Sequence, residues 1–145
     1  MRGFTLLEVV AVVCIIGVLA ALVAIAAVPG EAAVAEKEAR RLALLLELAA
    51  AETRASGEAI AWIPEPGGYA FWRKGDDGEW LRFPASSPYR PRAVDAAISI
   101  EGERAVFAAY GLQAPMAATI RGGNAELILR SGPLGRVSLQ RIHAH

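Results

Sequence analysis

A lone carboxylate stands at the start of a long uncharged segment. Glu8 is followed at once by twenty residues, 9–28, that carry no charge. An ionised side chain close to hydrocarbon is costly, so an acid in this position usually marks a functional contact. Without a partner the carboxylate would take up a proton, whereas a nearby cation would keep it ionised. The chemistry that Glu8 offers is therefore charge pairing at the end of an apolar helix.

The remaining residue types that carry out chemistry form no recognisable arrangement. His143 and His145 lie at the end of the chain, where a solvated tail is expected. The pair Asp76-Asp77 lacks the spaced ligand series of a calcium site, and Ser86-Ser87 has no histidine or aspartate arranged in a hydrolase motif. Cys14, the only cysteine, has no second thiol for a disulfide or a metal. The sequence thus predicts no enzyme activity, no metal site and no cofactor.

Charge and size set further limits. The 145 residues include 15 basic and 15 acidic side chains, so the formal net charge is zero with histidine neutral. Proteins that bind nucleic acid usually carry a basic surface, and this balance predicts none. The length fits one small domain together with one membrane segment.

The element that positions Glu8 is predicted to be a transmembrane helix. Twenty residues at about 1.5 Å each span about 30 Å, the thickness of a hydrocarbon core. Pro29-Gly30 ends the apolar stretch, and Arg2 precedes it. The position of Arg2 favours a cytoplasmic N-terminus and a translocated remainder.

Two plainer interpretations of this segment are a cleaved secretory signal peptide and a simple membrane anchor. Ala24-Ile25-Ala26 resembles the small-residue cleavage site of such a signal, but Glu8 and the length of the segment argue against it. A simple anchor explains the length but gives Glu8 no purpose, unless the acid merely reaches up to the membrane surface.

A second helix is expected over 31–56, ended by Gly57. One face of it collects four apolar residues that should pack on a sheet: Leu42, Leu45, Leu46 and Ala49. Leu44 and Leu48 fall outside this stripe. Either the helix is buried broadly, or these two leucines contact other subunits.

From residue 58 onwards, short apolar or alternating runs separated by turn residues predict strands. The first three should form an antiparallel meander joined by tight turns. The expected strands are 59–63, 69–73, 80–83, 97–100, 105–108, 118–121, 126–130 and 136–141. The predicted fold class is α+β, with one long N-terminal helix, its first half transmembrane, packed on a C-terminal antiparallel β-sheet domain.

The run Gly3-Phe4-Thr5-Leu6-Leu7-Glu8 resembles the processing site of type IV prepilins and type II secretion pseudopilins. The resemblance implies that a prepilin peptidase cuts after Gly3 and methylates the new N-terminal amine of Phe4. It also implies that Glu8, the fifth residue of the mature chain, acts in assembly. We expect Glu8 to accept the Phe4 amine of an adjacent subunit, because a staggered neighbour can bring together groups that one helix holds apart.

A weaker resemblance covers most of the chain. The chain is similar to the H-type minor pseudopilin of type II secretion and to FimT-like minor pilins at four places: residues 38–42, the turn Ser56-Gly57, the run 68–71 and the run 132–137. It implies a leader at 1–3, a transmembrane and assembly helix at 4–28, a soluble helical half at 29–57 and a periplasmic β domain at 58–145.

The function that the resemblance implies is structural: a minor pseudopilin in a periplasmic filament, anchored in the inner membrane with its N-terminus in the cytoplasm. The implied partners are other pseudopilins or minor pilins, the prepilin peptidase, the inner-membrane assembly platform and membrane lipid, with no nucleic acid. One alternative is a FimT-like minor pilin of a type IV pilus that serves assembly, motility or DNA uptake. The other is a membrane-anchored or secreted ligand-binding module.

Overall fold

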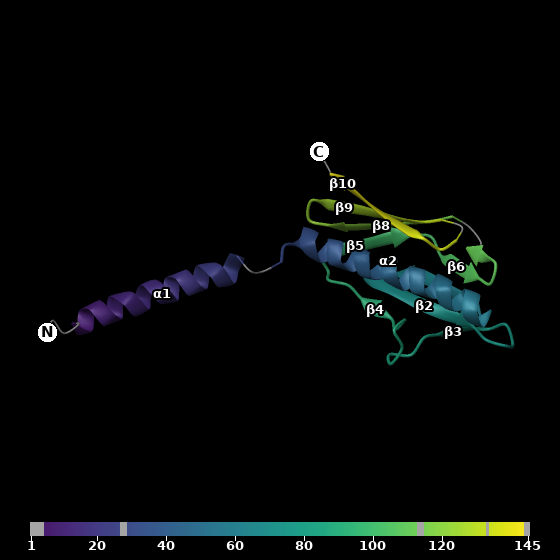
Figure 1. The fold of residues 1–145 in the computed structure, drawn as a ribbon, viewed down its shortest axis with the longest axis horizontal. Coiled ribbons are helices and arrows are strands. Elements are labelled where there is room, and N and C mark those ends of the chain that lie inside the picture. Colours follow the sequence, from purple (N-terminus) through teal and green to yellow (C-terminus); the bar gives the residue numbers. More distant parts are fainter. Residues whose placement is uncertain (1–4, 27–28, 113–114, 133, 144–145) are drawn as a thin grey trace.

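The computed structural model describes residues 5–26, 29–112, 115–132 and 134–143 (Figure 1). Its helical part is divided into α1 (Leu6–Ala26) and α2 (Glu31–Ser56). Pro29 has no amide hydrogen to donate and disfavours helical backbone in the residue before it, so one continuous helix is interrupted here. Gly30 then serves as the N-terminal cap of α2 in an extended conformation, with φ −66° and ψ 159°.

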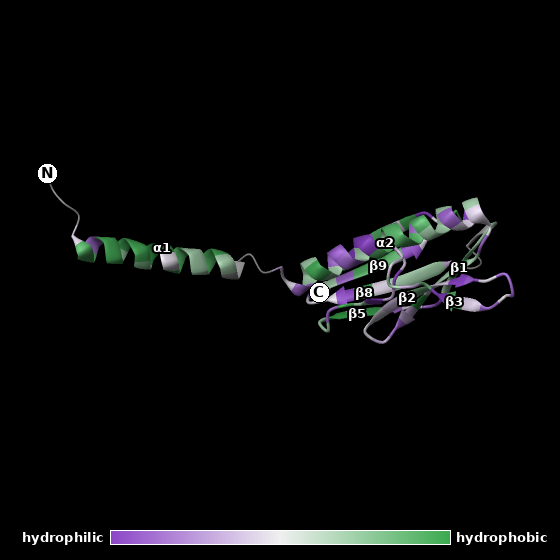
Figure 2. Cartoon of the chain, turned by 90° about the horizontal axis from the view of Figure 1, so that it is seen from below, coloured by the Kyte–Doolittle hydropathy of each residue, from purple (hydrophilic) through white to green (hydrophobic). Residues whose placement is uncertain are grey.

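Helix α1 is apolar on every face. Its 21 residues extend away from the rest of the described chain (Figure 1), and Figure 2 colours the helix as hydrophobic along most of its length. No residue of the stretch from Leu6 to Ala24 is buried, and by length and composition this stretch is able to cross a membrane. A helix that is hydrophobic all round requires an apolar environment outside its own chain.

Helix α2, by contrast, is amphipathic. Its fully buried apolar residues recur at helical spacing and form one stripe: Ala35, Ala39, Leu42, Leu46 and Ala49. The helix ends at Gly57, whose φ of 79° lies in the left-handed region that glycine adopts without strain. The Gly57 amide donates to Thr53 O and closes the last turn.

The first sheet contains the predicted meander. Strands β1 (Ile60–Glu65), β2 (Gly68–Lys74) and β3 (Trp80–Arg82) pair antiparallel in sequence order, which confirms that prediction. The sheet continues from β1 to β6 (Ala105–Ala108) and β7 (Gly111–Leu112), and β4 (Arg92–Ala93) pairs with β2. The two-residue strands β4 and β7 are too short to show as a pattern in the sequence.

The second sheet has four antiparallel strands in the order β10-β9-β8-β5. Its members are β5 (Ile98–Gly102), β8 (Met116–Gly122), β9 (Ala125–Ser131) and β10 (Val137–His143). Along β8 and β9, buried and more exposed side chains alternate, so one face is committed to the core.

Helix α2 contacts strands of both sheets, and Figure 2 shows it lying along one side of them. The core between the helix and the sheets is filled by large buried side chains: Trp62, Tyr69, Phe71, Phe107, Ile120, Leu127 and Leu129. The predicted α+β plan, a helical N-terminus packed on antiparallel strands, is confirmed. What the sequence did not reveal is that the strands divide into two sheets.

Two glycines of the second sheet, Gly122 at the end of β8 and Gly135 in the turn before β10, allow close approach to α2. A Cβ atom added to Gly122 would lie 2.8 Å from the Ala35 Cβ, and one added to Gly135 would lie 2.3 Å from the Ala50 Cβ. Gly135 also has a φ of 78°. The turn before β10 therefore needs glycine for two reasons, backbone conformation and contact with the helix.

We expect Gly135→Ala to lower the free energy of unfolding by about 2–4 kcal/mol, since left-handed strain and overpacking each contribute. Gly78→Ala is the matched control. Gly78 has a similar φ of 85°, but an added Cβ would meet no atom within 4 Å, so strain alone should cost about 1–2 kcal/mol. Denaturant unfolding of both variants measures the difference, and equal losses would contradict the close approach of this turn to α2.

Candidate functional site

Glu8 lies in the first turn of α1 with its side chain exposed. Thr5 precedes the helix, and its Oγ1 accepts a hydrogen bond of 3.3 Å from the Glu8 amide. The spacing Thr-x-x-Glu is that of a capping box, in which a side-chain oxygen satisfies an amide that the helix leaves free. A carboxylate at this end also interacts favourably with the helix dipole. Glu8 thus sits at a well-formed helix start, at the N-terminal end of an apolar span.

The predicted processing site lies outside the described residues. Gly3 and Phe4 both fall in the segment 1–4, so the structure places neither the scissile bond nor the amine expected to pair with Glu8. Cleavage, methylation and pairing remain predictions of the sequence.

The four predicted packing residues of α2 occupy the side that faces the sheets. Leu42, Leu46 and Ala49 are fully buried, and Leu45 is partly buried against the same core.

Leu44 and Leu48 lie outside the core. Their exposed fractions are 68% and 47%. The helix is therefore not buried broadly, and of the two possibilities for these leucines only contact with another molecule would cover them.

Helix α2 is fastened to the first sheet by a buried carboxylate. Glu38 accepts hydrogen bonds from Tyr69 Oη at 2.8 Å and from Arg92 Nε at 2.6 Å, and its side chain is only 7% exposed. Burial alone would raise the pKa of Glu38, but the bonds from Arg92 and Tyr69 outweigh it and hold this pKa below the ordinary value. Burial, together with the bond to Glu38, raises the pKa of the Tyr69 hydroxyl. The group is thus a neutral tyrosine and an arginine around an ionised glutamate.

Further polar contacts fix α2 along its length. Tyr89 Oη donates to Glu52 Oε2 at 2.7 Å, which holds the loop between β3 and β4. Arg54 Nη1 donates to the Leu134 carbonyl at 2.9 Å and holds the turn between β9 and β10. The residues that form these contacts are 37 and 80 positions apart in the chain. They orient the helix across the two sheets.

Within the described part of the chain, no group of three or more His, Cys, Asp or Glu side chains could hold a metal ion. Asp76 and Asp77 are exposed in the turn between β2 and β3, and Ser86 and Ser87 lie in the loop before β4. The side chains of His143 and His145 are outside the described residues.

A membrane-length apolar helix followed by a helix packed on antiparallel sheets defines a pseudopilin-like fold. No protein-family model matches the chain, and no curated protein matches its sequence. Among solved structures it is similar to the minor pseudopilin EpsH from the type 2 secretion system of Vibrio cholerae, with a TM-score of 0.62. The two share 12% sequence identity, and the match covers 75% of this chain and 96% of that one. At this identity the similarity establishes the fold.

Two features of the site were missed in the sequence. The cap at Thr5 has a local signal, the Thr-x-x-Glu spacing, and could have been found. The group of Glu38, Tyr69 and Arg92 has none, because its members lie on three elements up to 54 residues apart.

We expect Glu38→Gln to lower the free energy of unfolding by about 2 kcal/mol at pH 7, because it weakens two bonds to a buried charge and leaves Arg92 without its counter-ion. Glu36→Gln, two positions away, weakens two solvent-accessible pairs, with Arg40 and with Arg141, and should cost less than about 1 kcal/mol.

The loss caused by Glu38→Gln should depend on pH. The pKa of Glu38 is lower in the folded chain, so its stabilising contribution is complete above the ordinary value of 4.5 and declines as the pH falls below it. Chemical unfolding of wild type and variant between pH 7 and pH 3 measures this. A difference that stays constant over that range would contradict an ionised Glu38.

Proposed function

We propose that this chain is a minor pseudopilin, a structural subunit of the type II secretion pseudopilus. The observation that carries the proposal is a membrane-length helix with one carboxylate in its first turn, joined to a domain of pseudopilin-like fold. The H-type minor subunit is favoured because the structural likeness is to EpsH, a minor pseudopilin.

In this proposal the chain enters the inner membrane with its N-terminus in the cytoplasm and its β domain in the periplasm. The prepilin peptidase cuts after Gly3 and methylates Phe4. The new amine keeps its positive charge after methylation, and Glu8 follows Phe4 by four positions in the sequence. The motif Gly-Phe-Thr-Leu-Leu-Glu supports these steps.

Assembly then depends on an intermolecular charge pair. The backbone of one helix holds the Phe4 amine and the Glu8 carboxylate apart, but a neighbour displaced along the filament axis can place its amine against Glu8. Apolar surroundings strengthen such a pair and penalise either charge without its partner. The pair therefore favours one stagger between subunits, and other pseudopilins and the assembly platform are the partners.

The exposed ridge of α2, Leu44 and Leu48, continues the contact beyond the membrane. Both leucines lie away from the face of the helix that packs on the sheets. Large apolar side chains in this position are covered when helices associate laterally. Their exposure in the single subunit supports this role.

We expect Glu8→Gln to be processed normally yet to enter filaments at least tenfold less than wild type, because the amide cannot neutralise an incoming amine. Glu31→Gln, which removes the first-turn acid of α2, is the matched control and should assemble normally. Sheared filament fractions from a host with a complete secretion system measure incorporation, and mass spectrometry of the N-terminus should find methyl-phenylalanine at Phe4. A mature chain that begins near Ala27 would refute the proposal, as would normal assembly of Glu8→Gln.

We expect Leu48→Lys to reduce filament incorporation while the domain stays folded. Leu81→Lys provides the control, because Leu81 of β3 is exposed to nearly the same extent, 45% against 47%, but lies away from the helix. Incorporation and thermal unfolding are measured together. If both variants assemble equally well, the α2 ridge is not an interface.

A further inference from the structure

The turn that leads into β10 is held against the C-terminal part of α2. The Gly135 amide donates to the Gly132 carbonyl at 2.9 Å, and the Gly132 amide donates to the Arg136 carbonyl at 2.9 Å. Arg54 Nη1 of α2 donates to the Leu134 carbonyl, also at 2.9 Å. Three hydrogen bonds therefore fix the backbone of this turn.

The fixed turn presents one large apolar side chain to solvent. Leu134 is 80% exposed, more than either leucine of the α2 ridge. Single apolar side chains on a surface are common and need no explanation by themselves. This leucine differs from them because arginines from separate segments of the chain lie around its turn: Arg54 of α2, Arg130 of β9, and Arg136 directly before β10.

The positive charge around this turn is not balanced within the chain. All three arginines are exposed, and none of them takes part in an ion pair within the described residues. Glu47 of α2 also approaches the turn, where its carboxylate accepts the Val137 amide at 3.1 Å. Three positive charges and one negative charge leave an excess of two positive charges.

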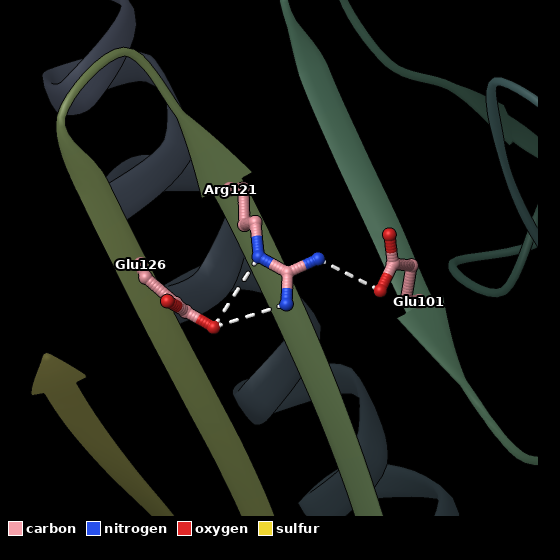
Figure 3. Close-up of polar contacts among 3 residues, drawn as sticks. All are labelled: Glu101, Arg121 and Glu126. Carbon is pink, nitrogen blue, oxygen red and sulfur yellow. Dashed lines mark hydrogen bonds and ion pairs between the residues drawn. The ribbon is translucent and has the colours of Figure 1, made fainter. Parts of the chain in front are cut away.

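Other arginines of the same sheet are neutralised. Arg121 of β8 bonds Glu101 of β5 through Nη1 at 2.7 Å, and bonds Glu126 of β9 through Nε at 3.2 Å and Nη2 at 3.1 Å (Figure 3). Arg141, near the other end of β10, lies 3.5 Å from Glu36. Within the described residues, the arginines of this sheet that lack a carboxylate partner thus gather at the end where β10 begins.

The position of the turn argues against a lipid surface as the binding partner. Arg54 and Glu31, where α2 begins, are separated by about 35 Å along the helix at about 1.5 Å per residue. Helix α1, the segment able to cross a membrane, precedes Glu31 in the chain. The turn therefore lies near the end of α2 that is remote from α1 and from any bilayer around it.

The make-up of the site argues against nucleic acid. Proteins that bind nucleic acid follow its phosphates with an extended basic surface, and single strands also stack on aromatic side chains. Here three arginines lie around one leucine, on a chain with no net charge. An apolar side chain between guanidinium groups instead matches a protein surface on which carboxylates surround an apolar contact, and arginine is enriched at such interfaces.

We propose that this turn is a docking site for an acidic segment of a partner protein. Leu134 packs on apolar side chains of the partner, and Arg130 and Arg136 pair with its carboxylates. Because hydrogen bonds fix the turn before binding, little conformational entropy is lost on association. The proposal is independent of the filament function, since it involves neither the carboxylate of α1 nor the exposed ridge of α2.

The test measures the binding of labelled peptides to the full chain in uncharged detergent micelles. The probe is a seven-residue peptide of five glutamates and two leucines. Two control peptides replace its glutamates by lysines or its leucines by serines, and a six-nucleotide oligothymidine with five phosphates matches its charge. We expect the probe to bind at least tenfold more tightly than the lysine peptide. It should bind at least threefold more tightly than the serine peptide or the oligothymidine. In NMR spectra, the largest shifts should occur at the amides of Leu134, Gly135 and Arg136.

Two pairs of variants locate the site. Arg130→Gln combined with Arg136→Gln breaks no ion pair within the described residues, and we expect it to weaken probe binding at least tenfold at low salt. Arg141→Gln, which also removes one positive charge but lies near the other end of β10, is the matched control and should change the affinity less than twofold. Leu134→Ser should weaken binding about threefold, whereas Ile142→Ser, an exposed position beside Arg141, should bind normally.

Equal binding of the lysine peptide, tighter binding of the oligothymidine, or unchanged affinity of the double arginine variant would each overturn the proposal. Thermal unfolding checks that the variants fold. If the double variant does not fold, the NMR shifts of the wild-type chain decide, and shifts that lie outside the turn overturn the proposal.

Discussion

Helix α1 exposes apolar side chains on every face, and this constraint governs the rest of the molecule. Twelve Leu, Ile and Val side chains of the helix are exposed. Burying each one would contribute about 1.5–3 kcal/mol, so leaving all of them in water forgoes roughly 20–35 kcal/mol. Only lipid or other apolar helices can recover a free energy of this size. The domain after residue 30 buries its own apolar core, whereas α1 depends on an apolar environment outside the chain.

The domain that follows α1 buries its apolar side chains within its own fold. Helix α2 is held against both sheets by apolar packing on one stripe and by polar contacts at Glu38, Glu52 and Arg54. Such contacts fix orientation more than they add stability, since paired buried charges lose much of their attraction to desolvation.

Local patterns in the sequence were sufficient to predict the helices and strands, but not which strands pair with one another. The apolar run follows from composition and the break at Pro29-Gly30 from the chemistry of proline. The stripe around Leu42 and Leu46 follows from periodicity, because side-chain direction repeats with the backbone. The division into two sheets cannot be predicted in this way. The alternation of side chains along a strand shows which face is buried but not which sheet the strand joins.

Long-range contacts were equally invisible. Glu38 and Arg92 look like ordinary surface charges when read along the chain, and Gly135 looks like any turn glycine. The close contact of Gly135 with Ala50 becomes apparent only when the strands are assembled on the helix.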